Sequence, residues 1–443
     1  MGEDTGKDKG NDTGTKKGFF YGWLVLLACV LIMALGYAPL VSCASLFTKP
    51  VTEDLGFTRS SYALVSTIAS LMMAFMSPFV GKIMSKPYMH KALVVCMLGN
   101  CLAYCCYSFA RTLPQFYITA ACLGFFECGS TMIPVSVLVT NWFKKKRGLI
   151  MSIAMVGSSV GGTILSPMIG NLIASHGWRF TYRAVGITRL IILVPLVLLV
   201  IRRTPADMGL KAYGADESGE TGKVKRMEKE WNVSLRELKS LPMFWIFVLG
   251  CFLITATSAV ITQIPASIMD AGYATTTAAS IASLYLFVAI PGKLILGHIF
   301  DRYGVKAGVL FGNTMFFLSV IALIFIKREP VLYLMAFLFG FGTCIGTVSI
   351  PVITSGIFGT KHYAEIYGFL SLFPSIGYAM GGPLIASSYD ISGSYNAAWI
   401  IVAVLAVVMT GALLYCYGAS RRQIKENEEK ASNRGAGMDT ALT

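Results

Sequence analysis

Charged residues are scarce in this chain of 443 residues, and their scarcity excludes an ordinary soluble protein. Asp, Glu, Lys and Arg make up 14% of the residues, whereas a soluble globular domain carries about 25%. Only 4 histidines occur, and no paired carboxylates stand at helical spacing within the apolar stretches. No catalytic constellation is therefore expected, and the chain is predicted not to be an enzyme.

Cysteine is absent from the polar segments, because all 11 cysteines fall within apolar stretches. This pattern predicts reduced thiols that pack between helices, not extracellular disulfides. Their spacing matches no metal site, so we expect neither a metal nor a cofactor. A cleavable signal sequence is also missing, since no short apolar core is followed by a small-residue cleavage site.

Twelve apolar stretches fill most of the chain, each long enough to cross a bilayer core of about 30 Å as a helix. They cover residues 19–47, 62–84, 92–110, 116–143, 149–174, 181–201, 244–269, 278–300, 307–326, 331–358, 364–388 and 397–417. Six precede a charged insert and six follow it, which is the layout of a secondary transporter.

The predicted fold is therefore an all-α membrane protein with twelve transmembrane helices in two six-helix bundles. The bundles cover residues 19–201 and 242–417, and a cytosolic linker at 202–241 joins them, with a short surface helix expected at 234–240. A disordered cytosolic tail is expected at 1–18 and a second cytosolic tail at 418–443.

The net charge of +14 is concentrated on one predicted side of the membrane. In this topology 28 of the 37 Lys and Arg residues lie on the side of the linker and tails, 7 lie opposite and 2 lie inside spans. This asymmetry places both termini in the cytosol. The basic runs lack stacking aromatics, so no nucleic-acid partner is expected, whereas the basic linker suits contact with anionic membrane lipids.

The two halves share a repeat that is visible in their glycines. At an offset of 220, four glycines at the fifth span (Gly148, Gly157, Gly161, Gly162) recur at the eleventh (Gly368, Gly377, Gly381, Gly382). Gly157 and Gly161 are four residues apart, as are Gly377 and Gly381, which is the spacing for close helix packing in lipid. We expect these glycines to let the two helices approach their neighbours.

The eighth span ends in a motif of Gly297, Asp301, Arg302 and Gly304 at a predicted cytosolic turn. The motif resembles the signature loop of the major facilitator superfamily, and the resemblance extends over nearly the whole chain. It implies that Asp301 and Arg302 hold a cytosolic gate through charge pairs between neighbouring helix ends. The first half departs from the pattern, because Ser85 stands where its acidic residue is expected.

Further motifs resemble the bacterial monocarboxylate and oxalate/formate branch of that superfamily. They are the segment 141–149, the glycines of the fifth span, Gly177-Trp178-Arg179, and the segments 203–210 and 389–395. The resemblance implies transport of a small organic anion by alternating access. It also implies a multi-pass protein of the plasma membrane, specifically a prokaryotic inner membrane.

Lys293 is one of three ionisable residues deep within spans, where charge is costly and marks a functional site by default. It lies 8 residues before Asp301, or about 12 Å inward from the membrane edge. In the branch that the chain resembles, a basic residue four before the loop glycine pairs with the substrate carboxylate. The alternatives are a lysine that extends to the cytosolic surface or one that pairs with another helix.

Glu127 and Arg189 are the other two deep charges, and both fall near mid-bilayer in the first half. A buried pair between them would neutralise two costly charges. The alternative is that Glu127 carries protons. With the pair formed, Lys293 would be an unmatched positive charge, which an anionic substrate would balance.

Two departures from the resemblance concern proton coupling and the substrate class. Ala289 stands four before Lys293, where proton-coupled relatives have an acidic residue. The eleventh span has no lysine, unlike that of oxalate exchangers; Lys361 lies before it. One deep cation suits one carboxylate, which favours a monocarboxylate, with a proton or a counter-anion as the coupling ion. Arg189 could add a second charge only by facing the cavity.

By analogy with the superfamily, spans 1, 4, 7 and 10 line the cavity. Tyr37, Thr262, Gln263 and Ser349 are then candidate polar contacts of the substrate, with packing or backbone bonding as the alternative. Tyr285 lies 8 residues before Lys293 and is expected on the same helix face.

Two rival functions stay open beside the transporter of a small organic anion. A facilitator-fold exporter of drugs or metabolites would tolerate replacement of Lys293, and cationic substrates would compete. A membrane sensor would bind a solute without moving it, and its linker would need a partner.

Overall fold

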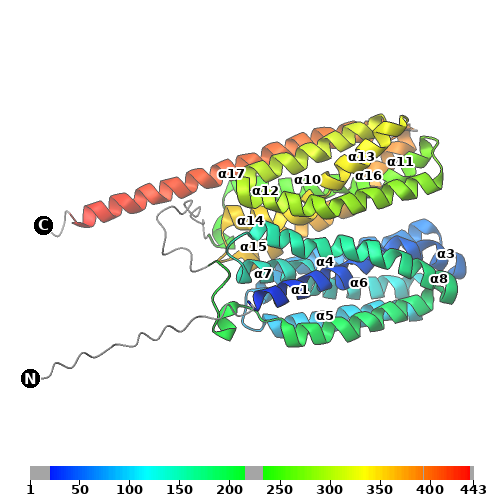
Figure 1. Cartoon of the computed structure of the whole chain (residues 1–443), viewed down its shortest axis with the longest axis horizontal. Coiled ribbons are helices and arrows are strands. Elements are labelled where there is room, and N and C mark those ends of the chain that lie inside the picture. Colours follow the sequence, from blue (N-terminus) through cyan, green and yellow to red (C-terminus); the bar gives the residue numbers. More distant parts are fainter. Residues whose placement is uncertain (1–19, 215–232, 393, 440–443) are drawn as a thin grey trace, which may run out of the picture.

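The computed structural model describes residues 20–214, 233–392 and 394–439, which form two helical bundles that lie alongside each other (Figure 1). The predicted tail at 1–18 and the middle of the predicted linker lie outside these residues. The described part contains helices, turns and one isolated bridge between Phe143 and Tyr213. The predicted all-α fold is confirmed.

The helices of the first bundle are α1 (Gly22–Leu31), the π-helix η1 (Ile32–Tyr37), α2 (Ala38–Val41), η2 (Ala44–Phe47), α3 (Thr48–Leu55), α4 (Arg59–Met84), α5 (Met89–Cys106), η3 (Tyr107–Phe109), α6 (Leu113–Ser130), α7 (Met132–Trp142) and α8 (Arg147–Val200). The segment between the bundles holds η4 (Pro205–Met208) and α9 (Leu235–Lys239). Helix α9 confirms the short helix predicted at 234–240.

The helices of the second bundle are α10 (Pro242–Ser258), η6 (Ala259–Thr262), α11 (Ile264–Asp270), α12 (Thr275–Ile324), α13 (Glu329–Gly342), the π-helix η7 (Ile345–Ser349), α14 (Ile350–Phe358), α15 (Tyr363–Leu370), α16 (Leu372–Ser392) and α17 (Asn396–Asp439). Helix α17 continues well past residue 417, where the twelfth span was predicted to end.

Ten helical stretches of the described residues are long and apolar enough to cross a bilayer. Two of them, α8 and α12, are each a pair of helices joined at a glycine. Gly177 and Gly304 have φ angles of 77° and 82°, a conformation that glycine adopts at little cost, so each helix bends back there. With each arm counted separately, the twelve predicted spans are confirmed within the described residues.

The first, fourth, seventh and tenth spans are each interrupted along their length. The π-helices η1 and η7 interrupt the first and tenth, and a 3-10 turn, η6, interrupts the seventh. The fourth breaks at Thr131, which has φ −120° and ψ −104°. A proline follows each interruption within a few residues (Pro39, Pro134, Pro265, Pro351). Such discontinuous helices are typical of the binding region of transporters.

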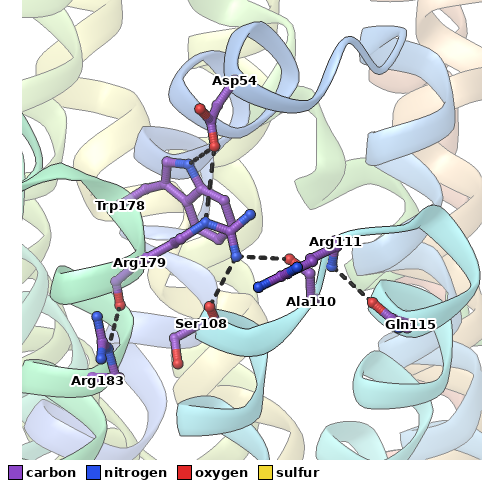
Figure 2. A network of polar contacts seen from close by, with 8 residues as sticks. All are labelled: Asp54, Ser108, Ala110, Arg111, Gln115, Trp178, Arg179 and Arg183. Carbon is purple, nitrogen blue, oxygen red and sulfur yellow. Dashed lines mark hydrogen bonds and ion pairs between the residues drawn. The ribbon is translucent and has the colours of Figure 1, made fainter.

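The turn of α8 farthest from the linker is fixed by the polar network in Figure 2. Trp178 Nε1 donates a hydrogen bond to Asp54 Oδ2 at 3.1 Å, and Arg179 Nε lies 3.9 Å from the same oxygen. Arg179 Nη1 also donates to the carbonyl oxygens of Ser108 and Ala110, both at 3.1 Å. The Gly-Trp-Arg motif of the sequence is therefore a structural tie between three turns of the first bundle.

The repeated glycines lie where helices cross closely. Gly157 and Gly161 of α8 face the backbone of the first span, and Gly377 and Gly381 of α16 face that of α10. At each position a Cβ atom would overlap or touch a carbonyl oxygen of the facing helix (Val30, Ala34, Phe252, Ala256). The fifth span therefore packs on the first in the same way as the eleventh packs on the seventh.

Candidate functional site

Lys293 of α12 is buried between the two bundles, with 4% of its surface exposed. Its ammonium group donates three hydrogen bonds to α8: to Ser159 Oγ at 2.8 Å, to Ser158 Oγ at 2.9 Å and to the Met155 carbonyl oxygen at 3.0 Å. An ammonium group has three N–H donors, so these bonds use all of them. The lysine does not reach the membrane surface, and its three bonds to α8 match the other alternative, a lysine that pairs with another helix.

The charge of Lys293 has only neutral partners in the described part of the chain. No carboxylate there lies within 4.0 Å of the ammonium nitrogen, and the ion pairs of Lys49 and Arg179 lie elsewhere. A buried charge without a counter-ion is costly in a low-dielectric interior. The site is therefore arranged to gain from a bound anion.

The predicted charge pair of Glu127 and Arg189 has no direct salt bridge among the described residues. Arg189 Nη2 donates instead to the Gly36 carbonyl oxygen at 3.0 Å and to Asn100 Oδ1, and the guanidinium lies 4.7 Å from the centre of the Tyr104 ring. Arg189 and Glu127 are still close enough to interact electrostatically. Arg189 is held inside the first bundle and does not add a second charge next to Lys293.

Glu127 is buried in α6, with 6% of its surface exposed. Its carboxyl group makes no hydrogen bond or ion pair to any described residue, and only its backbone carbonyl accepts bonds, from the hydroxyls of Ser130 and Thr131. Tyr37 of η1 lies within electrostatic range of Glu127 and also of Tyr378 from the second bundle. Glu127 is thus a buried acid of the first bundle whose carboxyl group has no bonded partner among the described residues.

The other predicted polar contacts do not surround Lys293 as a group. Gln263 Nε2 donates to Thr262 Oγ1 at 3.4 Å, and that hydroxyl donates to the Ala259 carbonyl, so the pair is bound to its own helix end. Tyr285 is 3% exposed and packs edge-on against Phe339, which makes it a core residue. In the second bundle, buried Ser349 has a hydroxyl with no partner among the described residues.

Asp301 joins the two bundles at the end where the linker lies, which we call the linker end. Its carboxylate accepts hydrogen bonds from the backbone N–H groups of Gly148 at 2.7 Å and Leu149 at 2.8 Å. These N–H groups lie in the first turn of α8, and the N-terminus of a helix favours a negative charge. In the described residues Asp301 therefore binds backbone amides at the end of a neighbouring helix, and the predicted gate of charge pairs between helix ends stays a prediction.

Arg302 makes no bond between the bundles to any described residue. Its guanidinium group lies over the ring of Tyr303, 5.5 Å from the ring centre. Gly297 permits the close crossing of α12 and α8, because a Cβ atom on Gly297 would lie 2.5 Å from the Gly148 carbonyl oxygen. A second crossing at the linker end is equally close, since a Cβ atom on Gly81 would lie 2.7 Å from the Cα of Gly368.

Several residues of this site were not identified from the sequence. Ser158 and Ser159 lie between the packing glycines of the fifth span, and two adjacent hydroxyls in an apolar helix were the available signal. Asn100, the partner of Arg189, is the only Asn in the stretch 92–110. The amides of Gly148 and Leu149 left no signal, because every residue except proline carries one.

The fold and sequence have relatives among known transporters. A family model described as Major Facilitator Superfamily matches residues 23–279 and 254–438. The crystal structure of the superfamily transporter FucP in the outward conformation matches with a TM-score of 0.65 and 16% identity, over 89% of this chain and 98% of that one. At that identity the likeness concerns the fold.

Three curated proteins are similar to most of the chain. Monocarboxylate transporter 12 of Homo sapiens is 25% identical over 410 residues, covering 86% of this chain and 77% of that protein. Monocarboxylate transporter 4 of Rattus norvegicus is 24% identical over 430 residues, with 93% and 87% covered. An MFS-type transporter of Gibberella moniliformis is 26% identical over 356 residues, with 77% and 78% covered. From the family match over most of its length, the chain belongs to the Major Facilitator Superfamily.

Proposed function

We propose that this membrane transporter carries a small monocarboxylate by alternating access and that Lys293 binds the carboxylate group. The observation that carries the proposal is the buried ammonium of Lys293, which has three neutral hydrogen-bond partners and no counter-ion among the described residues. The similarity to two monocarboxylate transporters supports the same substrate class. Arg189 donates through Nη2 to Asn100 and Gly36 inside the first bundle, away from the bonded partners of Lys293, so the proposal assigns the carboxylate to Lys293 alone.

The position of Lys293 suggests how binding drives the change of shape. The lysine belongs to the second bundle and all three of its acceptors belong to the first, so its hydrogen bonds hold the bundles together. A substrate carboxylate that takes over these N–H groups would release α8 and neutralise the charge. A ligand shifts a conformational equilibrium by this kind of differential contact. The contacts of Asp301 at the linker end then form the gate that opens.

The linker end is, in this proposal, the cytosolic side of a plasma membrane. The excess of Lys and Arg in the segments at that end supports the orientation. The family match supports a multi-pass membrane protein. The relatives named above are from animals and a fungus, so the prokaryotic inner membrane stays a prediction.

Ligand-induced thermal stabilisation of the purified protein tests the role of Lys293. The protein is heated with each member of a panel of mono- and dicarboxylates. A monocarboxylate should raise the melting temperature of the wild type, and the Lys293→Gln variant should show no such rise. Binding at 100 times Kd stabilises a protein by about 2.7 kcal/mol, which is readily measured. The control is Lys306→Gln, which removes an exposed lysine from the same helix α12.

The outcomes separate the rival functions. An equal response of wild type and Lys293→Gln would remove Lys293 from the site. Stabilisation by organic cations, with none by carboxylates, would favour the exporter. Stabilisation by a carboxylate that never moves into proteoliposomes would favour the solute sensor.

We further propose that Glu127 carries the coupling proton, as the alternative to anion exchange. Its carboxyl group is buried and unbonded among the described residues, and Ala289 leaves no acid one turn before Lys293. In proteoliposomes, Glu127→Gln should abolish stimulation of uptake by an inward proton gradient while substrate exchange continues. Glu53→Gln, at an exposed acid of the same bundle, is the control and should keep the stimulation. Proton stimulation that survives in Glu127→Gln would contradict this assignment.

A further inference from the structure

The linker end contains two crossings between the bundles, and the internal repeat relates them. Asp301 and Gly297 at the end of the eighth span correspond, at an offset of 216, to Ser85 and Gly81 at the end of the second. Gly148 at the start of the fifth span corresponds, at an offset of 220, to Gly368 in the eleventh. Both crossings use facing glycines, but only one has an acid at the signature position.

The second crossing has an acid all the same, on the opposite helix. Ser85 Oγ lies 2.8 Å from the Lys82 carbonyl oxygen and 3.3 Å from Glu365 Oε1, so its single O–H is shared between an acceptor of its own helix and one in the first turn of α15. Both side chains are partly buried. The contact joins the first bundle to the second, as the bonds from Gly148 and Leu149 to Asp301 do.

We propose that Glu365 is the gate acid of this crossing. The acid lies on the eleventh span, and the signature position of the second span carries its hydrogen-bond donor, Ser85. In this arrangement both gate carboxylates, Asp301 and Glu365, belong to the second bundle, and their donors belong to the first. A hydrogen bond to an ionised acceptor is about twice as strong as a neutral one, so this placement of acid and donor keeps a charge-assisted contact at the site. The proposal concerns the gate and does not depend on what Lys293 binds.

The contact between Ser85 and Glu365 lies in a polar cavity between the bundles and not on an open surface. A cavity of about 90 Å³ at this boundary is lined by both bundles, including Ser85, Asn141 and Glu365. Arg203, from the segment that leads out of the first bundle, also lines it, and its Nη2 donates to the Ser85 carbonyl oxygen at 3.3 Å. Lys361 and His362 also line the cavity. The cationic groups of this lining offset the charge of the carboxylate when the gate is closed.

Hydrogen exchange of the full chain in lipid nanodiscs, read by mass spectrometry, tests the proposal. Ser85→Asp places two carboxylates against each other, and amides at 79–86 and 363–370 should exchange about tenfold faster, the effect of losing one charge-assisted bond. The reciprocal variant, Ser85→Asp with Glu365→Ser, again pairs a carboxylate with a hydroxyl and should restore the protection. Ser240→Asp, at an exposed serine outside the crossing, is the matched control and should leave both segments unchanged.

The double variant separates a gate role from simple damage to the fold. A variant that exchanges faster because it is misfolded would not be rescued by a second substitution. Unchanged protection in Ser85→Asp would overturn the proposal, as would a double variant that exchanges as fast as the single one. Peptides at 147–152 report the Asp301 crossing and should keep their protection if the two crossings act separately.

Discussion

Gly161→Ala is expected to destabilise the protein by about 2 kcal/mol, the scale of overpacking in a tightly packed interior. A Cβ atom at this position of α8 would overlap the Ala34 carbonyl oxygen and lie 2.6 Å from the Ala34 Cα. Backbone atoms cannot rotate away as a flexible side chain can, so the first span must move outward. The melting temperature in detergent, with uptake in proteoliposomes beside it, measures the effect.

The same helix provides the control for this prediction. A Cβ atom on Gly170 of α8 would meet no atom of another element within 4 Å, so Gly170→Ala should be neutral or stabilising by up to about 1 kcal/mol, the helix propensity of alanine over glycine. Gly381→Ala should behave like Gly161→Ala, because a Cβ atom there would overlap the Ala256 carbonyl oxygen. Equal stabilities of the Gly161 and Gly170 variants would contradict the packing argument.

Asp301→Asn is expected to reduce net uptake at least tenfold. The substitution replaces an acceptor of two backbone bonds, from Gly148 and Leu149, by an amide whose NH₂ group faces one of those donors. Hydrogen bonds to charged groups contribute about 1.5–3 kcal/mol, so the equilibrium between closed and open gate shifts toward the open form by a factor of about ten or more. Uptake in proteoliposomes, together with hydrogen exchange at 147–152, measures the loss.

Binding should survive this change, which separates the gate from the substrate site. The variant should keep the carboxylate-induced rise in melting temperature, because Lys293 lies about 12 Å from Asp301 along α12. Asp270→Asn, at an exposed acid of α11, should behave as the wild type. Wild-type uptake and exchange in Asp301→Asn would show that the two amide bonds do not control the gate.

The course of the helices could be predicted from the sequence because bilayer thickness fixes the length of an apolar span. All twelve spans were found in this way, including the two that turn at Gly177 and Gly304. The end of α17 was missed, since its polar continuation past residue 417 carries no hydrophobic signal. The interruptions of the first, fourth, seventh and tenth spans were not predicted either, although a proline lies near each of them.

The sequence predicts how deep in the membrane the charged residues of the candidate site lie, but not which way their side chains point. Position along a helix gives the depth of Lys293, and the structure has it buried between the bundles. The same reasoning put Glu127 and Arg189 at similar depths, but depth does not say which way a side chain points around the helix axis. Arg189 points to Asn100 and the Gly36 carbonyl instead. Partners that are backbone groups, such as the Met155 carbonyl of Lys293, leave no trace in residue identity.

The interrupted spans show that few charged side chains in the sequence do not imply few polar groups within the membrane. A π-helical or broken turn frees peptide groups from the regular hydrogen-bond ladder, and unwound backbone in transporters coordinates ligands at mid-membrane. In η1, η6, η7 and at Thr131 the main chain itself can therefore supply polarity where side chains supply little. A scan of side-chain replacements would be blind to such groups, whereas ester substitution of single peptide bonds would detect them.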